Sequence, residues 1–372
     1  MNEAKMIMVG GFLGAGKTTL LWRVAKLLAG QGKHVGLITN DQAPDLVDTG
    51  LLLRQGVPVQ EVAGSCFCCN FEGLIGAADR LREGSKADYL IAEPVGSCAD
   101  LSATLLQPIK DKYRSDMTLA PLSVLIDPFR LREVLSGKPS MNGLHESAAY
   151  IVRKQMEEAD VIVLNKRDLL SEMDEKVMYG LIEAYYPDVQ VFSISALTGE
   201  GVDEWLEMVM NADESGLRVV DVDYDRYAEG EAVLGWLNAA ISLSGDRGVV
   251  DWQGFTGELM EGLREAFARN DSEVGHVKVL IGNQNQEIVA NLTRTGGEVT
   301  MRGKATGDAA EMILNARVEM RPSELEEIVR DVLEEVCLER RVDVEIGQLQ
   351  SLSPGRPEPT HRYDSVIDTA AK

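Results

Sequence analysis

The sequence contains 372 residues, of which 45% are hydrophobic and 26% are charged, and its formal net charge is −23. This length is typical of two globular domains. The acidic balance argues against a nucleic-acid-binding surface, because such a surface needs clustered lysine and arginine. The sequence has no run of 18 apolar residues, and its N-terminal stretch lacks the features of a signal peptide, so we expect a cytoplasmic protein without a membrane span.

The first 212 residues alternate between apolar β-branched runs and segments of helical periodicity. The predicted strands are Lys5–Val9, His34–Thr39, Val57–Val62, Asp88–Ala92, Thr118–Ile126, Asp160–Leu164 and Val189–Ile194. The predicted helices are Thr19–Ala29, Asn70–Glu83, Leu144–Glu158, Asp174–Tyr185 and Gly201–Met210. This alternation indicates an α/β fold whose mostly parallel sheet is flanked by helices. Ligands of such sheets bind beyond the carboxyl ends of the strands, so site residues are expected there.

A phosphate-binding P-loop, G-x-x-x-x-G-K-T, follows the first predicted strand and opens the first predicted helix. Its glycines allow backbone N–H groups to surround a phosphate at the positive end of that helix. Lys17 is expected to reach the β- and γ-phosphates, and the Thr18 hydroxyl is expected to bind Mg²⁺. The predicted nucleotide-contacting residues of this segment are Gly11, Gly14, Ala15, Gly16, Lys17, Thr18 and Thr19.

Two acidic residues end later strands on the predicted ligand side. Asp41 follows the second strand and can approach Mg²⁺, although an Asx turn that closes the strand explains it equally well. Glu93 follows the fourth strand in the segment E-P-V-G and is expected to hold the water shell of Mg²⁺. Gly96, three residues later, can offer its amide to the γ-phosphate, which is the usual basis of a nucleotide-dependent switch.

A cysteine cluster, C-x-C-C, lies between these two acids at Cys66, Cys68 and Cys69. Thiolates at this spacing can hold Zn²⁺, Cu⁺ or a similar ion. A redox-active thiol and buried packing are the alternatives. The sequence has five cysteines, and three of them within four residues do not form a disulfide framework, so a reducing compartment is expected. For the two isolated cysteines, Cys98 and Cys337, we expect packing in the core.

A guanine-recognition motif, N-K-x-D, follows the sixth predicted strand. The Asp168 carboxylate can accept hydrogen bonds from N1–H and the N2 amine of guanine, and adenine lacks both donors in that arrangement. Asn165 is expected to brace a neighbouring loop, and the Lys166 stem is expected to cover the base. A second base-contacting loop is predicted after the last strand, at Ser195, Ala196 and Leu197.

The composition changes after residue 212, where an acidic stretch predicts a linker that includes a short edge strand. The predicted strands beyond it are Ala232–Leu243, His276–Ile281, Glu287–Thr293, Glu311–Met320 and Val342–Leu349, and the predicted helices are Thr256–Arg269 and Ser323–Glu339. This order is typical of a ferredoxin-like α+β domain with an extra hairpin. Gly296–Gly307 is expected to form turns or a flexible loop, and the tail from Ser351 is expected to be extended or disordered. The predicted division is a domain over 1–212, a linker over 213–230, a domain over 231–350 and a tail over 351–372.

Taken in order, these motifs resemble those of the metal-handling P-loop GTPases related to CobW, UreG and HypB. The cysteine cluster, and Glu93 where many GTPases have aspartate, are similar to the CobW-like branch. The resemblance covers roughly residues 5–212. The four histidines are isolated and form no metal-collecting tract, and nothing after residue 212 matches a family motif. The resemblance therefore identifies neither the metal nor the client protein.

The resemblance implies slow hydrolysis of GTP to GDP and phosphate with Mg²⁺, and binding of Zn²⁺ or Co²⁺ at the cysteine cluster. It implies a metallochaperone or cofactor-assembly factor that serves a client metalloprotein, and homodimerisation is common among such relatives. A corrinoid or cobalamin client is implied by the family name alone. No nucleic acid or membrane partner is expected.

The position of the cysteine cluster between Asp41 and Glu93 suggests a nucleotide-gated metal carrier. If both acids close around Mg·GTP, the cysteine loop moves with them, and metal affinity then depends on the nucleotide. A GTP-dependent switch or binding module with purely structural cysteines is the main alternative. A P-loop kinase is disfavoured by N-K-R-D, and a thiol redox sensor would need cysteines that oxidise reversibly without metal.

Overall fold

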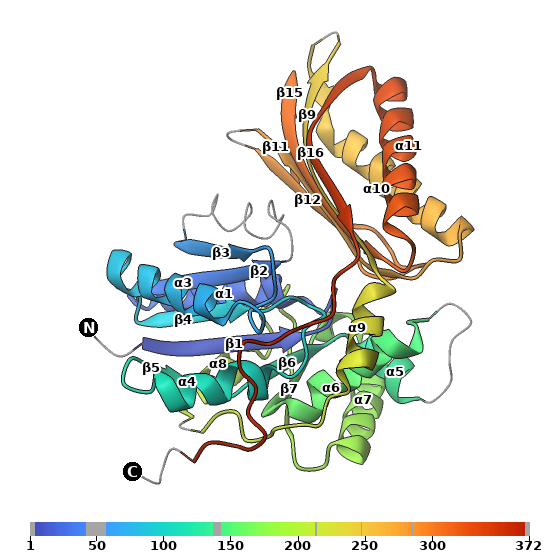
Figure 1. Cartoon of the computed structure of the whole chain (residues 1–372). Coiled ribbons are helices and arrows are strands. Elements are labelled where there is room, and N and C mark those ends of the chain that lie inside the picture. Colours follow the sequence, from blue (N-terminus) through green and yellow to red (C-terminus); the bar gives the residue numbers. More distant parts are fainter. Residues whose placement is uncertain are drawn as a thin grey trace.

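The computed structural model describes residues 4–41, 57–136, 143–212, 214–246, 248–283 and 286–368. These residues form two large sheets with their own helices and one small two-stranded sheet (Figure 1). The first sheet has the strand order β3-β2-β4-β1-β6-β7-β8, with β5 also paired to β1, and every pairing in it is parallel. Its strands are β1 Ala4–Gly11, β2 Val35–Asp41, β3 Val59–Ala63, β4 Tyr89–Glu93, β5 Met117–Leu119, β6 Ser123–Ile126, β7 Val161–Leu164 and β8 Gln190–Ser193. The predicted α/β fold with a mostly parallel sheet is confirmed.

Helices cover both faces of this sheet, because successive side chains of its buried strands point to opposite sides. On β1, Ile7 and Val9 pack under α1 and α8, whereas Met6 and Met8 pack on the opposite face with α3 and α6. The helices are α1 Lys17–Gly30, α3 Phe71–Gly84, α4 Gln107–Lys112, α5 Pro128–Leu135, α6 Glu146–Glu158, α7 Glu172–Tyr185 and α8 Val202–Asn211, with a π-helical segment at Ser102–Leu106 and a 3₁₀ turn at Arg167–Leu169. None of the helices in the described ranges combines the length and the apolar character that a bilayer-spanning segment needs.

The single strand predicted over Thr118–Ile126 is wrong, because the chain forms β5 and β6 there with a break between them. Pro121 lies in the break and has no N–H to continue the ladder. Both halves still pair with β1, so the sheet order is preserved.

The second sheet is antiparallel, with the order β13-β12-β11-β15-β9-β16. Its strands are β9 Gly235–Gly245, β11 Val274–Gly282, β12 Glu287–Leu292, β13 Thr300–Lys304, β15 Ala309–Val318 and β16 Val342–Leu352. Helices α10 Trp252–Arg269 and α11 Pro322–Arg340 lie together on one face (Figure 1). The strands β16, β9, β15 and β11 lie in the order of a split β-α-β-β-α-β unit, and the β12–β13 hairpin extends one edge. The expected ferredoxin-like domain is therefore present.

Two expectations about the connecting segments are wrong. A helix, α9 Tyr224–Ala232, replaces the predicted edge strand of the linker, and β9 begins at Gly235 rather than at Ala232. Asp223 caps this helix by accepting from two backbone N–H groups, and Gly230 allows close packing on α6. The stretch Gly296–Gly307, expected as turns or a flexible loop, contains β13 and the short β14 Thr306–Gly307, which pairs with β10 Val250–Asp251. All five residues of β13 are exposed, so this edge strand has no hydrophobic alternation to predict it.

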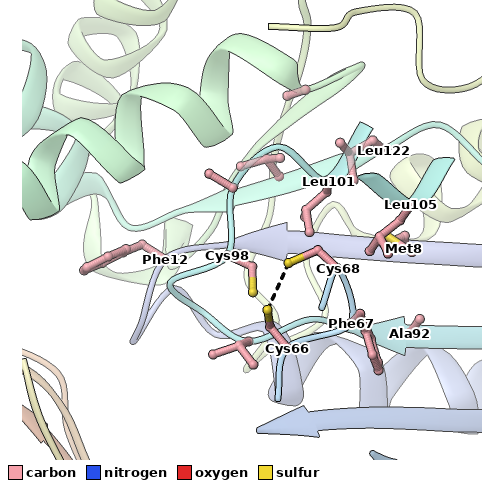
Figure 2. Close-up of a cluster of buried hydrophobic side chains, with 14 of the residues drawn as sticks. Met8, Phe12, Cys66, Phe67, Cys68, Ala92, Cys98, Leu101, Leu105 and Leu122 are labelled. Carbon is pink, nitrogen blue, oxygen red and sulfur yellow. Dashed lines mark hydrogen bonds between the residues drawn. The ribbon is translucent and has the colours of Figure 1, made fainter. Parts of the chain in front are cut away.

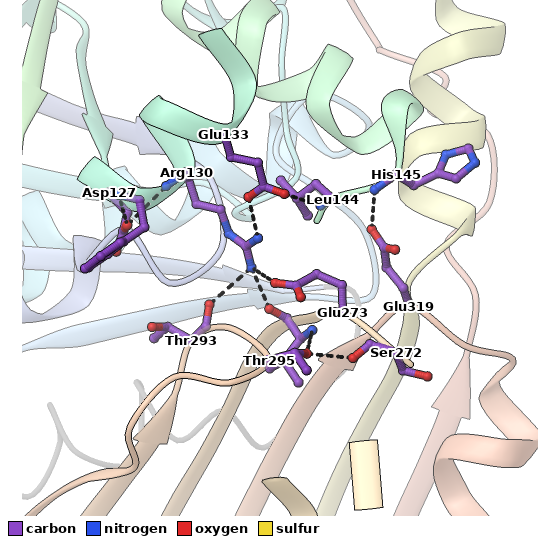
Figure 3. Close-up of polar contacts among 12 residues, drawn as sticks. Asp127, Arg130, Glu133, Leu144, His145, Ser272, Glu273, Thr293, Thr295 and Glu319 are labelled. Carbon is purple, nitrogen blue, oxygen red and sulfur yellow. Dashed lines mark hydrogen bonds and ion pairs between the residues drawn. The ribbon is translucent and has the colours of Figure 1, made fainter. Parts of the chain in front are cut away.

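The two domains are joined by a buried polar contact around Arg130 of α5 (Figure 3). Its guanidinium forms an ion pair with Glu273 at 2.6 Å and donates to the Val274 carbonyl at 2.7 Å. The same guanidinium pairs with Glu133 of its own helix at 2.9 Å. Nearby, the His145 N–H donates to the Glu319 carboxylate. The start of β11 is therefore held against the first domain.

The tail after β16 runs extended along the first domain (Figure 1). The Tyr363 N–H donates to the Ala103 carbonyl at 3.0 Å, and Arg362 forms an ion pair with the buried Asp100 at 2.8 Å. The tail thereby returns from the second domain to the first.

Candidate nucleotide and metal site

The P-loop has a backbone that only glycine adopts easily. Gly11, Gly14 and Gly16 all have positive φ angles, of 127°, 76° and 96°. A Cβ on Gly11 would lie 2.2 Å from the Leu125 carbonyl oxygen, and one on Gly16 would lie 2.3 Å from the Asn165 side-chain nitrogen. The motif glycines are therefore required both by conformation and by close packing.

Lys17, Thr18, Glu93 and Gly96 come together where β1 and β4 end. The Lys17 ammonium donates to the Gly11 carbonyl at 2.8 Å, and the Thr18 hydroxyl lies 3.0 and 3.1 Å from the two carboxylate oxygens of Glu93. A Cβ on Gly96 would lie 3.1 Å from the Lys17 ammonium nitrogen. A hydroxyl and a carboxylate in contact form an oxygen donor set that suits Mg²⁺, directly or through its water shell.

Asp41 ends β2 beside this group, but its carboxylate is paired with an arginine of the second domain. Arg317 of β15 approaches the two carboxylate oxygens at 3.0 and 2.8 Å. Both side chains are buried. In this structure Asp41 therefore contributes to the domain contact, and its expected role towards Mg²⁺ stays a prediction.

The N-K-R-D segment joins two loops of the site. The Asn165 amide donates to the Ala15 carbonyl at 2.7 Å and accepts from the Ala196 N–H at 2.9 Å, so it links the P-loop to the S-A-L loop. Lys166 has a left-handed backbone and pairs with Asp127. Asp168 is exposed on the wall of the cavity described next.

A cavity of about 800 Å³ contains these residues and lies between the two domains. Residues of the P-loop, Asp41, Glu93, Gly96, Asp168, Ala196 and Leu197 line it from the first domain. The second domain contributes side chains from the face of its sheet that carries no helices, among them Trp236, His276, Lys278, Asn291, Arg302 and Arg317. Gly14 is so close to this sheet that a Cβ there would lie 2.9 Å from Thr293 Cβ. The second domain thus forms the far wall of the nucleotide cavity, which the sequence did not predict.

The three cysteines of C-x-C-C gather in one cluster, and Figure 2 shows Cys66 and Cys68 of this cluster. The Sγ–Sγ distances are 2.9 Å for Cys66–Cys68, 3.3 Å for Cys66–Cys69 and 3.8 Å for Cys68–Cys69. A tetrahedral zinc site with Zn–S bonds of about 2.3 Å separates its sulfurs by roughly 3.8 Å, so small shifts would let the three bind one ion. Cys66 and Cys68 are buried, and Cys69 is partly exposed.

Hydrogen bonds within the cluster shift the pKa values of its thiols in opposite directions. The neighbouring Cys68 and Cys69 thiols stabilise a charge on the Cys66 sulfur and lower the pKa of Cys66. The hydrogen bond to Cys66 raises the pKa of Cys69 to about 11. Because metal ions bind cysteine as thiolate, an ion bound at this cluster would displace the thiol protons.

Asn40, the residue before Asp41, holds the cysteine loop in place. Its side chain donates to the carbonyls of Val62 and Ser65, each at 2.8 Å, and accepts from the Phe67 N–H at 2.8 Å. Strand β2 therefore supports the cysteine loop at one residue and presents an acid to the nucleotide cavity at the next.

Residues 5–193 match the family described as CobW/HypB/UreG, nucleotide-binding domain. The chain belongs to this family. The family resemblance expected from the motifs is thus confirmed, and the matched segment contains the P-loop, the cysteine cluster and N-K-R-D.

Relatives of this family member include metal-related GTPases and chaperones. The chain is 28% identical over 211 residues to zinc-regulated GTPase metalloprotein activator 1 of Dictyostelium discoideum, over 50% of this chain and 44% of that protein. It is 29% identical over 198 residues to hydrogenase maturation factor HypB of Azotobacter chroococcum, over 53% and 56%, and 28% identical over 181 residues to zinc chaperone YjiA of Escherichia coli, over 47% and 53%. The matches span about half the length of these relatives.

Solved structures of HypB and YjiA show partial likeness to this chain. HypB from Helicobacter pylori in complex with nickel has a TM-score of 0.41 and 19% identity, over 56% of this chain and 86% of that one. Zn(II)-bound YjiA from Escherichia coli has a TM-score of 0.33 and 16% identity, over 89% and 99%. The fold assignment for this family member rests on its own strand order.

Sequence reasoning missed several groups near the site, and Cys98 is the clearest. It packs in the hydrophobic core, as expected, and its thiol also lies beside those of Cys66 and Cys68. Its position two residues after Gly96 was a signal that could have placed it near the switch segment. Cys337 lies in the hydrophobic core of the second domain, as expected.

Proposed function

We propose that this chain binds and hydrolyses GTP and couples its nucleotide state to metal binding at Cys66, Cys68 and Cys69. The cargo is Zn²⁺ or Co²⁺, and the chain acts as a metallochaperone or cofactor-assembly factor for a client metalloprotein. A corrinoid or cobalamin-related client is one form of this proposal. The observation that carries it is the position of Asn40, which supports the cysteine loop, next to Asp41, which faces the nucleotide cavity.

The residues of the cavity suit in-line attack of water on the γ-phosphate of GTP. Lys17 would neutralise charge that develops on the β- and γ-phosphate oxygens, and Gly96 would offer its amide to the γ-phosphate. Thr18 and Glu93 would hold Mg²⁺, which supplies further charge neutralisation when bound. Asp168 would select guanine by accepting from two of its N–H groups. Among the residues that line the cavity in the described part of the chain there is no glutamine to orient water, so we expect slow turnover.

Neighbouring strands of the first sheet connect the nucleotide cavity to the cysteine cluster and provide a route for coupling. In the parallel sheet, Asp41 of β2 lies beside Ala63 of β3, three residues before Cys66, and Thr39 lies beside Glu93 of β4. A change at the phosphate side therefore has a short covalent and hydrogen-bonded path to the cluster. By linkage, metal must then change GTP affinity by the same factor as GTP changes metal affinity.

The test is a titration of Zn²⁺ and of Co²⁺ into reduced, metal-free protein, with GDP and with a non-hydrolysable GTP analogue. A variant with Cys66, Cys68 and Cys69 all changed to alanine serves as the control. Cysteine-dependent binding that differs by about tenfold or more between nucleotides, or about 1.4 kcal/mol, supports the proposal. Cysteine-dependent binding that ignores the nucleotide would favour the alternative of a GTP switch with a structural metal, and absence of binding would refute metal handling.

Hydrolysis needs its own measurement. Phosphate release from GTP is expected to be slow, to require Mg²⁺ and to disappear in Lys17→Ala. Release that is unaffected by this substitution would show that the cavity is not the hydrolytic site.

A further inference from the structure

A fourth cysteine approaches the cluster from the core side. Cys98 follows β4 and belongs to the same segment as Glu93 and Gly96. Figure 2 shows its sulfur directed towards the sulfur of Cys66, and the Cys68 sulfur lies on the same side. Its thiol lies close enough to those of Cys66 and Cys68 to interact with both.

The surroundings of Cys98 are unlike those of a thiol that only fills space. The buried Glu231 of α9 accepts from the Ser97 hydroxyl through one carboxylate oxygen, and its other oxygen has no hydrogen-bond partner within the described residues. This carboxylate interacts electrostatically with both Cys66 and Cys98. A polar side chain with an unsatisfied oxygen thus lies in the same buried region as Cys66 and Cys98.

We propose that Cys98 is a fourth thiolate ligand that completes a four-sulfur site with Cys66, Cys68 and Cys69 for Zn²⁺ or another thiophilic cation. The inference rests on the proposed metal binding at the three-cysteine motif. The three motif sulfurs lie within 4.8 Å of one another, and the ion would draw Cys98 towards them from the side of Cys66 and Cys68. Four thiolates form a closed tetrahedral site with no position left for water.

The segment that carries Cys98 also carries Gly96, and one buried glutamine binds both. The Gln155 amide donates to the Gly96 carbonyl at 3.0 Å and to the Cys98 carbonyl at 2.7 Å. The Cys98 N–H closes the turn by donating to the Val95 carbonyl at 2.9 Å. A displacement of Gly96 by a γ-phosphate at Lys17 would therefore move Cys98 relative to the other three cysteines. The number of thiolates on the metal would then differ between the GTP and GDP states.

Cobalt provides the test, because thiolate-to-cobalt charge transfer absorbs light in proportion to the number of bound thiolates. Metal-free, reduced wild-type protein, Cys98→Ser and the matched control Cys337→Ser are each titrated with Co²⁺. We expect Cys98→Ser to lose about a quarter of the charge-transfer intensity at saturation and to bind more weakly by about tenfold or more, while Cys337→Ser behaves as wild type. Equal spectra and affinities for Cys98→Ser and wild type would overturn the inference.

A measurement on the unmodified chain avoids dependence on the folding of the variant. X-ray absorption of the zinc-loaded wild type should give four sulfur neighbours in at least one nucleotide state, and three or fewer in every state would overturn the inference while leaving the proposed function intact. A wild type that binds neither Zn²⁺ nor Co²⁺ would overturn the proposed function as well.

Discussion

Asp41 and Arg317, 276 positions apart in the sequence, form a buried ion pair that connects β2 of the first domain to β15 of the second. The arginine is fixed from its own domain. Its other terminal nitrogen donates to the Leu237 carbonyl at 3.0 Å and to the Asn238 side chain at 2.8 Å, and its guanidinium lies 4.2 Å from the ring centre of Trp236. Because Arg317 is held by its own domain, Asp41 can approach Mg²⁺ only by breaking this ion pair.

Breaking this pair should therefore destabilise the domain contact. Asp41→Asn leaves a buried guanidinium without its counter-charge, and removal of one partner of a buried pair costs about 3–5 kcal/mol. In a double-mutant cycle with Arg317→Met, measured by denaturant unfolding, we expect a coupling energy of about 1 kcal/mol or more. The exposed pair Arg321–Glu324 of α11 is the control and should show no measurable coupling. Additive effects at Asp41 and Arg317 would contradict the proposed link between domains.

Guanine selection should depend on Asp168. Asp168→Asn places an amide donor where guanine presents two N–H groups, so we expect GDP affinity to fall by about 30-fold, or ~2 kcal/mol. Binding of a fluorescent GDP analogue measures this loss. Asp203→Asn, an exposed substitution in the first turn of α8, should bind as wild type. An unchanged affinity in Asp168→Asn would mean that another group reads the base.

The residues expected to bind the phosphates could be predicted from the sequence, because the carboxyl ends of parallel strands lie on the same side of a sheet. Strand order and motif spacing sufficed to expect Lys17, Thr18 and Glu93 together, and the structure brings them together. The N-K-R-D asparagine likewise bridges two loops.

The missed groups depend on contacts between segments that sequence patterns do not pair. Arg317 reaches Asp41 only because the second domain packs with its helix-free face over the cavity. Cys98 joins the cluster because the turn after β4 folds back, which a lone cysteine in the sequence does not reveal. The tail contacts the cysteine loop through hydrogen bonds that each involve at least one backbone group, and backbone groups carry no sequence signal.

His276 should make stability depend on pH. Burial lowers the pKa of His276 well below its ordinary value, and the positive charges of Lys278, Arg317 and Lys17 around it lower that pKa further. The folded state keeps this ring neutral, whereas the unfolded chain binds a proton near pH 6.5, so its stability contribution is present above that pH and is lost as the pH falls.

We therefore expect the His276 contribution to the free energy of unfolding to decrease by up to about 1.4 kcal/mol per pH unit as the pH falls below 6.5. The difference in unfolding free energy between wild type and His276→Gln should change by this amount between pH 6.5 and pH 5.5, whatever the stability of the variant at neutral pH. His34→Gln, whose side chain is 65% exposed, is the control and should keep the wild-type slope. Parallel slopes for His276→Gln and wild type would contradict the assignment.

The tail covers the cysteine cluster through three hydrogen bonds. The Thr360 N–H donates to the Cys68 carbonyl at 2.8 Å, and the Thr360 hydroxyl donates to the Cys69 carbonyl at 3.1 Å. The Glu358 N–H donates to the Cys69 sulfur at 3.2 Å. Any reagent or ion that reaches the buried cysteines from this side has to displace the tail first.

Release of the tail should therefore expose the cluster. Arg362→Ala removes the ion pair with the buried Asp100 that anchors the tail just beyond Thr360. Local opening then becomes easier, and we expect thiol labelling of the metal-free protein by Ellman's reagent to accelerate by about tenfold, which corresponds to about 1.4 kcal/mol in the opening equilibrium. Arg356 lies on the same tail and forms an exposed ion pair with Asp225 of α9. Arg356→Ala is therefore the matched control and should leave the labelling rate close to wild type. Equal labelling rates for Arg362→Ala and wild type would show that the cysteines are reached by a path the tail does not cover.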